Sequence, residues 1–336
     1  MKELILAIES SCDDSSIAVI DVNTYECVFY EKISQDEHSD FGGVVPELAS
    51  RLHTEALPKI LAKTKPFFND LKAIAVTNEP GLSVSLQSGV AMAKALSVAL
   101  NLPLIAVNHL KGHICSLFLD SELENDFLVL LVSGGHTMII EISKEFEIGI
   151  LASTSDDSFG ESFDKVAKMM NLGYPGGVFI EELAKLENNN TYEFSLPIPN
   201  KNRLEYSFSG IKNQVRLAIQ NNIDNNTLEQ DKANIAAAFQ RIACKHIINK
   251  LNIVLSKRHY KALGVVGGAS ANLLLRSELE KIAKKHNSKL LLAPLKYCSD
   301  NALMIARAAI NAYKHKDFVN ISDDIINPKS KNFQRL

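Results

Sequence analysis

The sequence predicts an α/β protein built of two lobes. The chain has 336 residues, 46% of them hydrophobic, so it can bury a large core, and its length favours two lobes over one. Short apolar runs typical of buried strands alternate with longer amphipathic stretches typical of helices. A strand, a turn and a returning strand open the chain at residues 4–20, and the same pattern returns at residues 127–142. Each half of the chain therefore begins with its own hairpin.

The first half reads as strands alternating with helices. Pro46 suits the first turn of a helix, because proline lacks only an N–H that this turn leaves unpaired anyway. A later helix, at residues 83–100, carries Gly89 and several alanines, so a backbone of the same lobe or of a partner subunit can approach it closely. The expected elements are strands at 4–8, 17–20, 73–77 and 104–107 and helices at 46–62 and 83–100.

The second half continues this alternation. Phe163, Val166 and Met170 fall on one helical face and leave Asp164 free to point elsewhere. The expected elements are strands at 127–132, 137–142 and 262–266 and helices around 163–170 and at 231–256, 272–286 and 301–314. The expected division is a first lobe of residues 1–112 with about 300–325, a second lobe of residues 113–299, and a loosely ordered tail at 326–336.

Two histidines, His109 and His113, lie four residues apart in a short helix expected after residues 104–107. Side chains at this spacing point the same way, so one divalent ion can contact both imidazoles. A third ligand must come from elsewhere and offer oxygen or nitrogen, since the chain has no CxxC pair. Asp300 is the best candidate. The alternative is that Asp300 only caps the helix after it and that both histidines are ordinary surface residues.

Glycine-rich turns end several of the expected strands. Ser133-Gly134-Gly135-His136 follows one strand, and Gly267-Gly268 follows another. Glycine at such a junction lets backbone N–H groups approach an anion without a Cβ in the way. One such turn also serves hairpins without a ligand, but repeated turns of this kind at strand ends suggest a nucleotide held between two lobes.

The first hairpin turn carries three carboxylates, Glu9, Asp13 and Asp14. Three acids that face a cleft suit a cation or a metal-bound phosphate. Most polar turns of this kind are only solvated hairpin tips, so both readings stay open.

Bulk composition limits the class of protein. A net charge of −3 and a pI near 6.3 exclude a global basic field, so a polynucleotide has to be bound by local patches or with help from another subunit. Five scattered cysteines fit a reducing compartment better than a disulfide framework. No stretch resembles a signal peptide or reaches the ~20 apolar residues that span a bilayer. The sequence therefore predicts a cytoplasmic protein, with Lys201, Arg203, Lys212 and Arg216 as a candidate basic patch.

The motifs taken together resemble one family, the tRNA threonylcarbamoyladenosine transferases. The resemblance covers nearly the whole chain in order, and the combination is very specific. It rests on IESSCD at 8–13, GGVVPELASR at 42–51, NHLKGH at 108–113, VSGGHT at 132–137, YPGG at 174–177, FSG at 208–210, GGASAN at 267–272 and CSDN at 298–301.

The resemblance implies a fold and a reaction. The fold is of the actin, Hsp70 and sugar-kinase type, with two related RNase H-like lobes and a nucleotide cleft between them. The reaction is transfer of the threonylcarbamoyl group from threonylcarbamoyl-AMP to N6 of adenosine 37, beside the anticodon, in tRNAs that read codons beginning with A. Relatives work with an inactive paralogue and a small ATPase, while a separate enzyme makes the adenylate.

The resemblance also implies site residues. The metal ligands are His109, His113 and Asp300, for one divalent ion per subunit, iron(II) with zinc as the alternative. The adenylate-binding positions are Leu131, Val132, Ser133, Gly134, Gly135, Asp164, Gly177 and Asn272. Two positions depart from many relatives, Lys111 where an acid is common and Glu181 where some have aspartate, and neither belongs to the ligand set.

Three other classes remain open. A zincin-type metallopeptidase needs a glutamate directly after the first histidine, and Leu110 stands there. A phosphotransferase of the sugar-kinase type shares the expected fold but prefers oxygen ligands for its magnesium ion. The third class is a non-catalytic scaffold. If the protein were one, mutation of the ligand set would leave tRNA modification intact. The sequence does not single out a general base, and Glu9 and Asp13 are the candidates.

Overall fold

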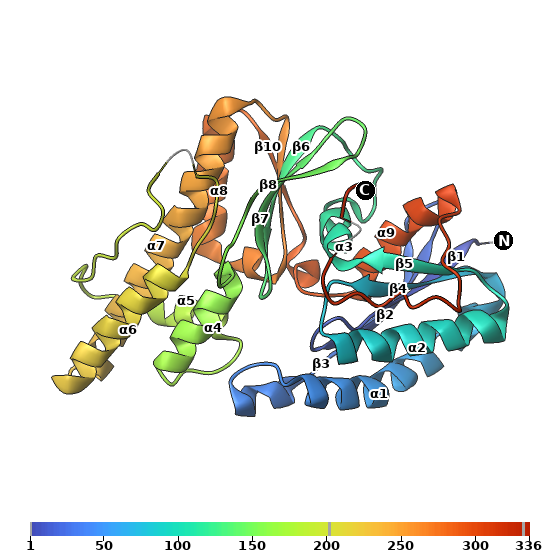
Figure 1. The fold of residues 1–336 in the computed structure, drawn as a ribbon, viewed down its shortest axis with the longest axis horizontal. Coiled ribbons are helices and arrows are strands. Elements are labelled where there is room, and N and C mark those ends of the chain that lie inside the picture. Colours follow the sequence, from blue (N-terminus) through green and yellow to red (C-terminus); the bar gives the residue numbers. More distant parts are fainter. Residues whose placement is uncertain (1, 201–202, 331–332) are drawn as a thin grey trace. The chain divides into compact units, whose positions relative to one another are not determined.

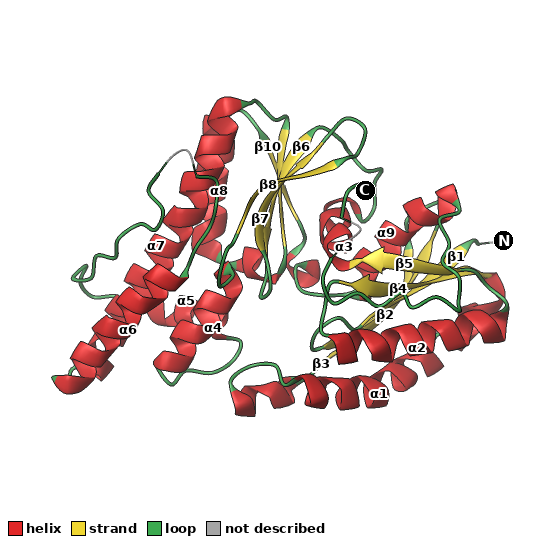
Figure 2. Cartoon of the chain, in the orientation of Figure 1, coloured by secondary structure: helices red, strands yellow, loops and turns green. Residues whose placement is uncertain are grey.

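The computed structural model describes residues 2–200, 203–330 and 333–336. The chain divides into two compact units (Figure 1). The first unit comprises Met1–Asn125, Phe146–Ile148 and Ala293–Leu336, and the second comprises Asp126–Glu145 and Gly149–Leu292. Each unit contains a five-stranded sheet with helices packed on it (Figure 2). The predicted α/β class is confirmed.

The first unit contains β1 (Leu4–Glu9), β2 (Asp14–Asp21), β3 (Cys27–Ser34), α1 (Pro46–Ala62), β4 (Leu71–Glu79), α2 (Ser83–Leu100), β5 (Leu104–Asn108), α3 (His109–Cys115) and α9 (Ala302–His315), with 3-10 helices η1 (Asp36–Phe41), η2 (Lys65–Asp70), η3 (Ser116–Phe118) and η5 (Leu295–Tyr297). Its sheet has the strand order β3-β2-β1-β4-β5. Side chains alternate across β1: Ile5 and Ala7 pack with α9, whereas Leu6 and Ile8 pack with α1 and α2. The sheet is therefore covered by helices on both faces.

The second unit contains β6 (Phe127–Val132), β7 (Thr137–Ile142), β8 (Ile148–Ser153), α4 (Phe159–Met169), α5 (Gly176–Ala184), α6 (Ser209–Asp224), α7 (Leu228–Lys257), β9 (Ala262–Val266), η4 (Gly268–Ala271), α8 (Leu273–Lys285) and β10 (Lys289–Leu292). Its sheet has the order β10-β9-β6-β7-β8. The core contains Phe163 of α4, Phe239 of α7 and Leu279 of α8, all buried with the side chains of β6 and β9. The described helices of this unit thus share one core with its sheet.

Both sheets have the same topology. Counted within its own unit, the strand order is third, second, first, fourth, fifth in each case. β1 pairs antiparallel with β2 and parallel with β4, and β6 pairs in the same way with β7 and β9. The repeated hairpin in the sequence therefore marks two units of related fold, as predicted.

Helix α2 packs closely within its own unit. A Cβ on Gly89 would lie 2.4 Å from the hydroxyl oxygen of Ser10, so this glycine permits contact with the segment after β1. In the described part of the chain, α2 is also the one helix that is long and apolar enough to cross a membrane, by length and composition alone. The sequence predicts that no apolar stretch is long enough to span a bilayer, and α2 is an exception to that prediction. Its burial of Leu86, Val90 and Ala93 is that of a core helix.

The division differs from the predicted boundaries. α3 runs across residue 112, and a single helix belongs to one unit, so the first unit extends to Asn125. The C-terminal residues, expected to be a loose tail, also pack on this unit. Asn327 donates its N–H to the carbonyl of Asn78 at 3.0 Å, and the side chain of Phe333 is buried.

Candidate active site

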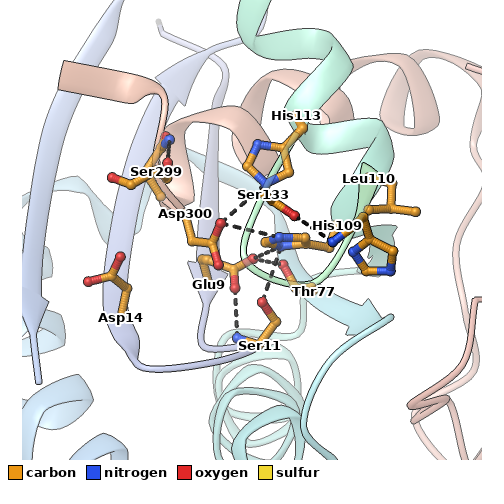
Figure 3. A network of polar contacts seen from close by, with 12 residues as sticks. Glu9, Ser11, Asp14, Thr77, His109, Leu110, His113, Ser133, Ser299 and Asp300 are labelled. Carbon is orange, nitrogen blue, oxygen red and sulfur yellow. Dashed lines mark hydrogen bonds and ion pairs between the residues drawn. The ribbon is translucent and has the colours of Figure 1, made fainter. Parts of the chain in front are cut away.

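The histidine helix begins where strand β5 ends. Asn108 is the last residue of β5, and its side-chain oxygen accepts the N–H groups of Leu110 and Lys111 at 2.9 and 3.3 Å. This cap starts α3 at His109 and places His113 one turn later on the same face. The two imidazole centroids are 4.6 Å apart, with their planes at 85° (Figure 3).

Asp300 lies against both histidines. Its Oδ1 atom is 3.3 Å from Nε2 of His109 and 3.2 Å from Nε2 of His113 (Figure 3). The cap of α9 is instead Asn301, whose side chain accepts the N–H of Met304 at 3.0 Å. The alternative that Asp300 serves only as a helix cap is therefore wrong. Neither histidine is a surface residue, since His109 is 7% exposed and His113 is fully buried.

The cluster fits a metal ion. One ligand atom from each of His109, His113 and Asp300 lies within 4.8 Å of the others. Among the residues that the structure describes, Nδ1 of His113 has no hydrogen-bond partner, and Nε2 lies 3.2 Å from the Asp300 carboxylate without forming a well-aligned hydrogen bond. A buried imidazole without a partner is costly, and an ion on Nε2 would satisfy it. Two nitrogens and one oxygen form a donor set that suits iron or zinc and leaves coordination positions open.

The charges of the cluster lead to the same interpretation. Burial disfavours a charged His109, but the carboxylates of Asp300 and Glu9 outweigh this and raise its pKa well above the usual value. Burial lowers the pKa of His113. A proton on His109 thus balances buried negative charge, and a divalent ion would replace that proton on binding.

Glu9 contacts His109 on the side away from Asp300. One carboxylate oxygen of Glu9 is 3.2 Å from Nδ1 of His109 and also accepts a hydrogen bond from the hydroxyl of Thr77 (Figure 3). The other oxygen accepts the N–H of Ser11 at 2.6 Å. Glu9 is fully buried, so it orients His109 and is not free to act as the general base considered from the sequence.

The three acids of the first turn do not form one cation site. Asp14 faces Lys32, whose ammonium is 3.0 Å away, and it also accepts the hydroxyl of Ser34 at 2.6 Å. Burial raises the pKa of Asp14 to about 6, and burial also raises the pKa of Asp13. Glu9 is occupied with His109, which leaves Asp13 as the carboxylate of the turn that is available for proton transfer.

In the second unit, two of the predicted glycine turns lie side by side at the carboxyl ends of neighbouring strands. β6 ends at the turn Ser133–His136, and β9, its parallel neighbour, ends at Gly267. Gly267 has φ +93°, and a Cβ there would lie 2.2 Å from the carbonyl oxygen of Val132. Only glycine fits this position without moving the backbone. The edge where the carboxyl ends of parallel strands meet is the usual ligand site in open α/β sheets.

The turn after β6 is held by the start of α4. The hydroxyl of Ser158 donates to the carbonyls of Ser133 and Gly134 at 3.1 and 2.6 Å, and Gly160 donates its N–H to Ser133 at 3.2 Å. Gly134 and Gly135 are exposed, and a Cβ on either would meet no atom within 4 Å. Their backbone is therefore accessible to a ligand.

The other predicted adenylate positions have differing environments. Leu131 and Val132 are fully buried in β6, so only their backbone is available to a ligand. Asp164 accepts the N–H of Gly176 at 2.7 Å and thereby fixes the start of α5, where Gly177 lies. Asn272 caps α8 by accepting the N–H of Leu275 at 2.9 Å. The adenylate role of these residues stays a prediction.

Glu181 joins two of these segments. Its carboxylate accepts the N–H of Leu273, the first residue of α8, at 2.7 Å. It therefore ties α5 to the residue that follows Asn272. Sequence reasoning set Glu181 aside as a departure from relatives, and only the spatial proximity of α5 and α8 reveals this contact.

The predicted basic patch is partly paired with acids of the chain. Lys212 forms an ion pair with Asp157, and the guanidinium of Arg203 is 2.6 Å from Glu205. Arg216 donates to Asn213 at 3.1 Å. Lys201 lies outside the described residues. Two of the four predicted cations thus have an acidic partner within the chain.

The relatives of this chain reported below share one described activity. The sequence model of the family described as tRNA N6-adenosine threonylcarbamoyltransferase matches residues 27–307. A protein of that description from Campylobacter jejuni subsp. jejuni is 62% identical over 337 residues, covering 100% of each chain. Another, from Campylobacter concisus, is 60% identical, with 97% of this chain and 98% of the relative covered.

Solved structures with the same fold are more distant in sequence. HypF from T. kodakarensis is 12% identical with a TM-score of 0.64, over 97% of this chain and 49% of that one. Component A of the (R)-2-hydroxyglutaryl-CoA dehydratase from Acidaminococcus fermentans is 14% identical with a TM-score of 0.54, over 94% and 99% of the two chains. These similarities confirm the actin, Hsp70 and sugar-kinase class of fold.

Fold and relatives together define an enzyme of this fold class that modifies RNA. The chain belongs to the tRNA N6-adenosine threonylcarbamoyltransferase family. It is an acyltransferase that forms N6-threonylcarbamoyladenosine in tRNA.

Proposed function

We propose that this acyl transfer is assisted by one divalent ion held by His109, His113 and Asp300. The supporting observation is the His-His-Asp cluster with two buried imidazoles, in which Nε2 of His113 faces the Asp300 carboxylate at 3.2 Å and Nδ1 has no hydrogen-bond partner among the described residues. Iron(II) is the proposed ion, with zinc as the alternative, because both accept this mixed nitrogen and oxygen donor set.

The proposed donor is threonylcarbamoyl-AMP, and the acceptor is N6 of adenosine 37 in tRNAs that read codons beginning with A. This amine is a weak nucleophile because its lone pair is shared with the ring. The carbamoyl carbon therefore needs a good leaving group, which the mixed anhydride with AMP provides. When bound, the metal ion supplies Lewis-acid polarisation of a donor oxygen.

The residues of the chain bind the donor and move the proton. The exposed backbone at Gly134 and Gly135 offers N–H groups to the phosphate of the adenylate. Asp13 accepts the N6 proton as the new N–C bond forms and the bond to AMP breaks. Its pKa, raised by burial, moves this carboxylate toward the range useful for a general base.

The proposed setting is a cytoplasmic complex. An inactive paralogue and a small ATPase are the proposed partner subunits, and a separate enzyme supplies the adenylate. The support for this is the resemblance of the motifs to the family as a whole.

Mass spectrometry of digested tRNA tests the proposal. The purified protein, with its partner subunits, is incubated with unmodified tRNA and threonylcarbamoyl-AMP. N6-threonylcarbamoyladenosine should form with metal-loaded protein, disappear after chelation and return with iron(II). Full modification by protein that elemental analysis finds metal-free would contradict the metal role. A parallel incubation with ATP and sugars controls for phosphotransferase activity.

A further inference from the structure

One part of the second unit departs strongly from the charge of the whole chain. Between Lys245 and Lys289 the sequence has ten Lys and Arg residues and two Glu residues, which gives a local charge of +8. The whole chain has a net charge of −3. Lys250 is buried and donates to backbone carbonyls, so it adds nothing to the surface. The remaining excess of cations is of the kind that forms a local nucleic-acid-binding surface in a protein without a global basic field.

The fold brings two runs of these cations together. The run at 257–261 begins at the last residue of α7, and the run at 284–289 begins in the last turn of α8. Strands β9 and β10 pair in parallel with Lys289 opposite Ala262, and Lys289 donates its N–H to the carbonyl of Lys261 at 2.8 Å. The two runs therefore lie next to each other at the amino ends of these strands.

A groove between α7 and α8 continues this surface. It encloses about 320 Å³, and the lysines that line it are Lys245, Lys281 and Lys285. Lys285 and His286 both contact the side-chain oxygen of Asn252 at 3.0 Å, which ties the two helices together. The groove is thus a fixed feature of the unit.

Several of these cations have no acidic partner. Lys257, Lys261 and Lys284 are exposed, and no ion pair to them is found in the part of the chain that the structure describes. Arg258 is held by Asp126 and Glu141, and Lys281 by Glu278. The surface therefore has uncompensated charge, whereas Lys212 and Arg203 each lie against a carboxylate of the chain.

The chemistry of the surface favours a phosphate backbone over bases. Tyr260 is the one Phe, Tyr or Trp between residues 245 and 289, and it is buried, so none of these large aromatic rings in the stretch is available to stack on a base. Exposed lysines on both sides of a groove instead match a row of phosphates. Such contacts position a nucleic acid without reading its sequence.

We propose that the surface formed by residues 257–261, 284–289 and the α7–α8 groove binds the phosphate backbone of the substrate tRNA. This inference rests on the proposed function. β9 spans the distance from this surface to the turn at Gly267, and its five residues correspond to about 17 Å. That distance is no more than a few nucleotides of backbone, so one tRNA arm reaches from the glycine turns to the basic surface.

A triple variant, Lys257→Ala with Lys261→Ala and Lys284→Ala, tests the assignment. Its control is Lys59→Ala with Lys65→Ala and Lys168→Ala, which removes the same charge from exposed lysines elsewhere. Binding of unmodified tRNA to the full-length protein is measured across a salt series, and modification kinetics are measured with the partner subunits present. The triple variant should lower the slope of log affinity against log salt by about 3 and weaken binding at least tenfold at ~50 mM salt. The KM for tRNA should rise, with the KM for the adenylate unchanged.

The outcomes separate two kinds of failure. If the triple variant and its control bind and modify tRNA as the active wild-type protein does, the surface assignment is wrong and the proposed function stands. An acidic protein partner that binds the wild type but not the triple variant, with tRNA binding unchanged, would also overturn it. If the wild type neither binds nor modifies tRNA, the proposed function and this inference fail together.

Discussion

At the scale of single residues, the metal cluster depends on a side chain that is not one of its ligands. Glu9 accepts a hydrogen bond from the ring nitrogen of His109 that faces away from Asp300. A proton fixed on Nδ1 leaves Nε2 as the free donor atom, so Glu9 selects the tautomer that can bind a metal. Contacts from Thr77 and Ser11 hold the carboxylate in place.

This role predicts a loss of metal affinity when the charge of Glu9 is removed. Glu9→Gln keeps an oxygen for the N–H of Ser11 but presents a weaker partner to His109. We expect zinc or cobalt affinity to fall by about 10–100-fold. The measurement is competition between the apoprotein and a chromophoric chelator.

Asp14→Asn is the matched control, since Asp14 lies in the same turn but faces Lys32. Its metal affinity should equal that of the wild type. Equal affinities for wild type and Glu9→Gln would show that Glu9 does not orient the ligand.

At the scale of elements, the C-terminal segment supports the histidine helix. Asn327 donates from its amide to Glu79 at 2.8 Å, and Glu79 in turn accepts from the amide of Asn108 at 3.0 Å. The hydroxyl of Ser330 accepts from the same amide at 2.7 Å. Because Asn108 caps α3, this chain of contacts fixes the point at which the histidine helix begins.

We therefore expect Asn327→Ala to weaken both the fold and the metal site. Loss of a hydrogen bond to a buried carboxylate should reduce the free energy of unfolding by about 1–2 kcal/mol. Urea unfolding checks this value, and elemental analysis at limiting metal checks the site. Ser322→Ala, in an exposed turn of the same segment, should change neither. An Asn327→Ala protein as stable as wild type would remove the segment from the support of α3.

Elements were predictable where one local signal dominates. Pro46 sets the start of α1, and the predicted bounds 46–62 and 83–100 agree with α1 and α2. β8 and β10 were not predicted. β10 has four residues and none is fully buried, while in β8 only Ala152 is, so neither shows the apolar run or alternation of a buried strand.

The metal ligands of the site could be predicted from the sequence, but the residues that orient those ligands could not. Spacing alone puts His109 and His113 on one helical face, and Asp300 was the best candidate for the third ligand before the resemblance implied the same residue. Glu9 reaches His109 because β1 pairs in parallel with β4, which brings Glu9 beside Thr77. Long-range strand pairing of this kind leaves no mark in the local sequence.

At the scale of the whole molecule, the two predicted ligands belong to different units. The metal cluster lies wholly in the first unit, and the glycine turns with Asn272 lie in the second. Each unit has buried core residues of its own, in separate clusters. A substitution at one site therefore should leave the fold of the other unit intact.

This separation predicts two opposite phenotypes. His113→Ala should lose its metal in elemental analysis while its affinity for AMP, measured by calorimetry, stays at the wild-type value. Asn272→Ser should keep its metal and bind AMP about tenfold more weakly, the loss expected for one hydrogen bond to a charged phosphate. Serine is the sharper choice than alanine, because its hydroxyl can still cap α8, where Asn272 accepts the N–H of Leu275. Unchanged AMP affinity in Asn272→Ser would remove that residue from the adenylate site, and loss of both ligands in either variant would show that the two units do not bind independently.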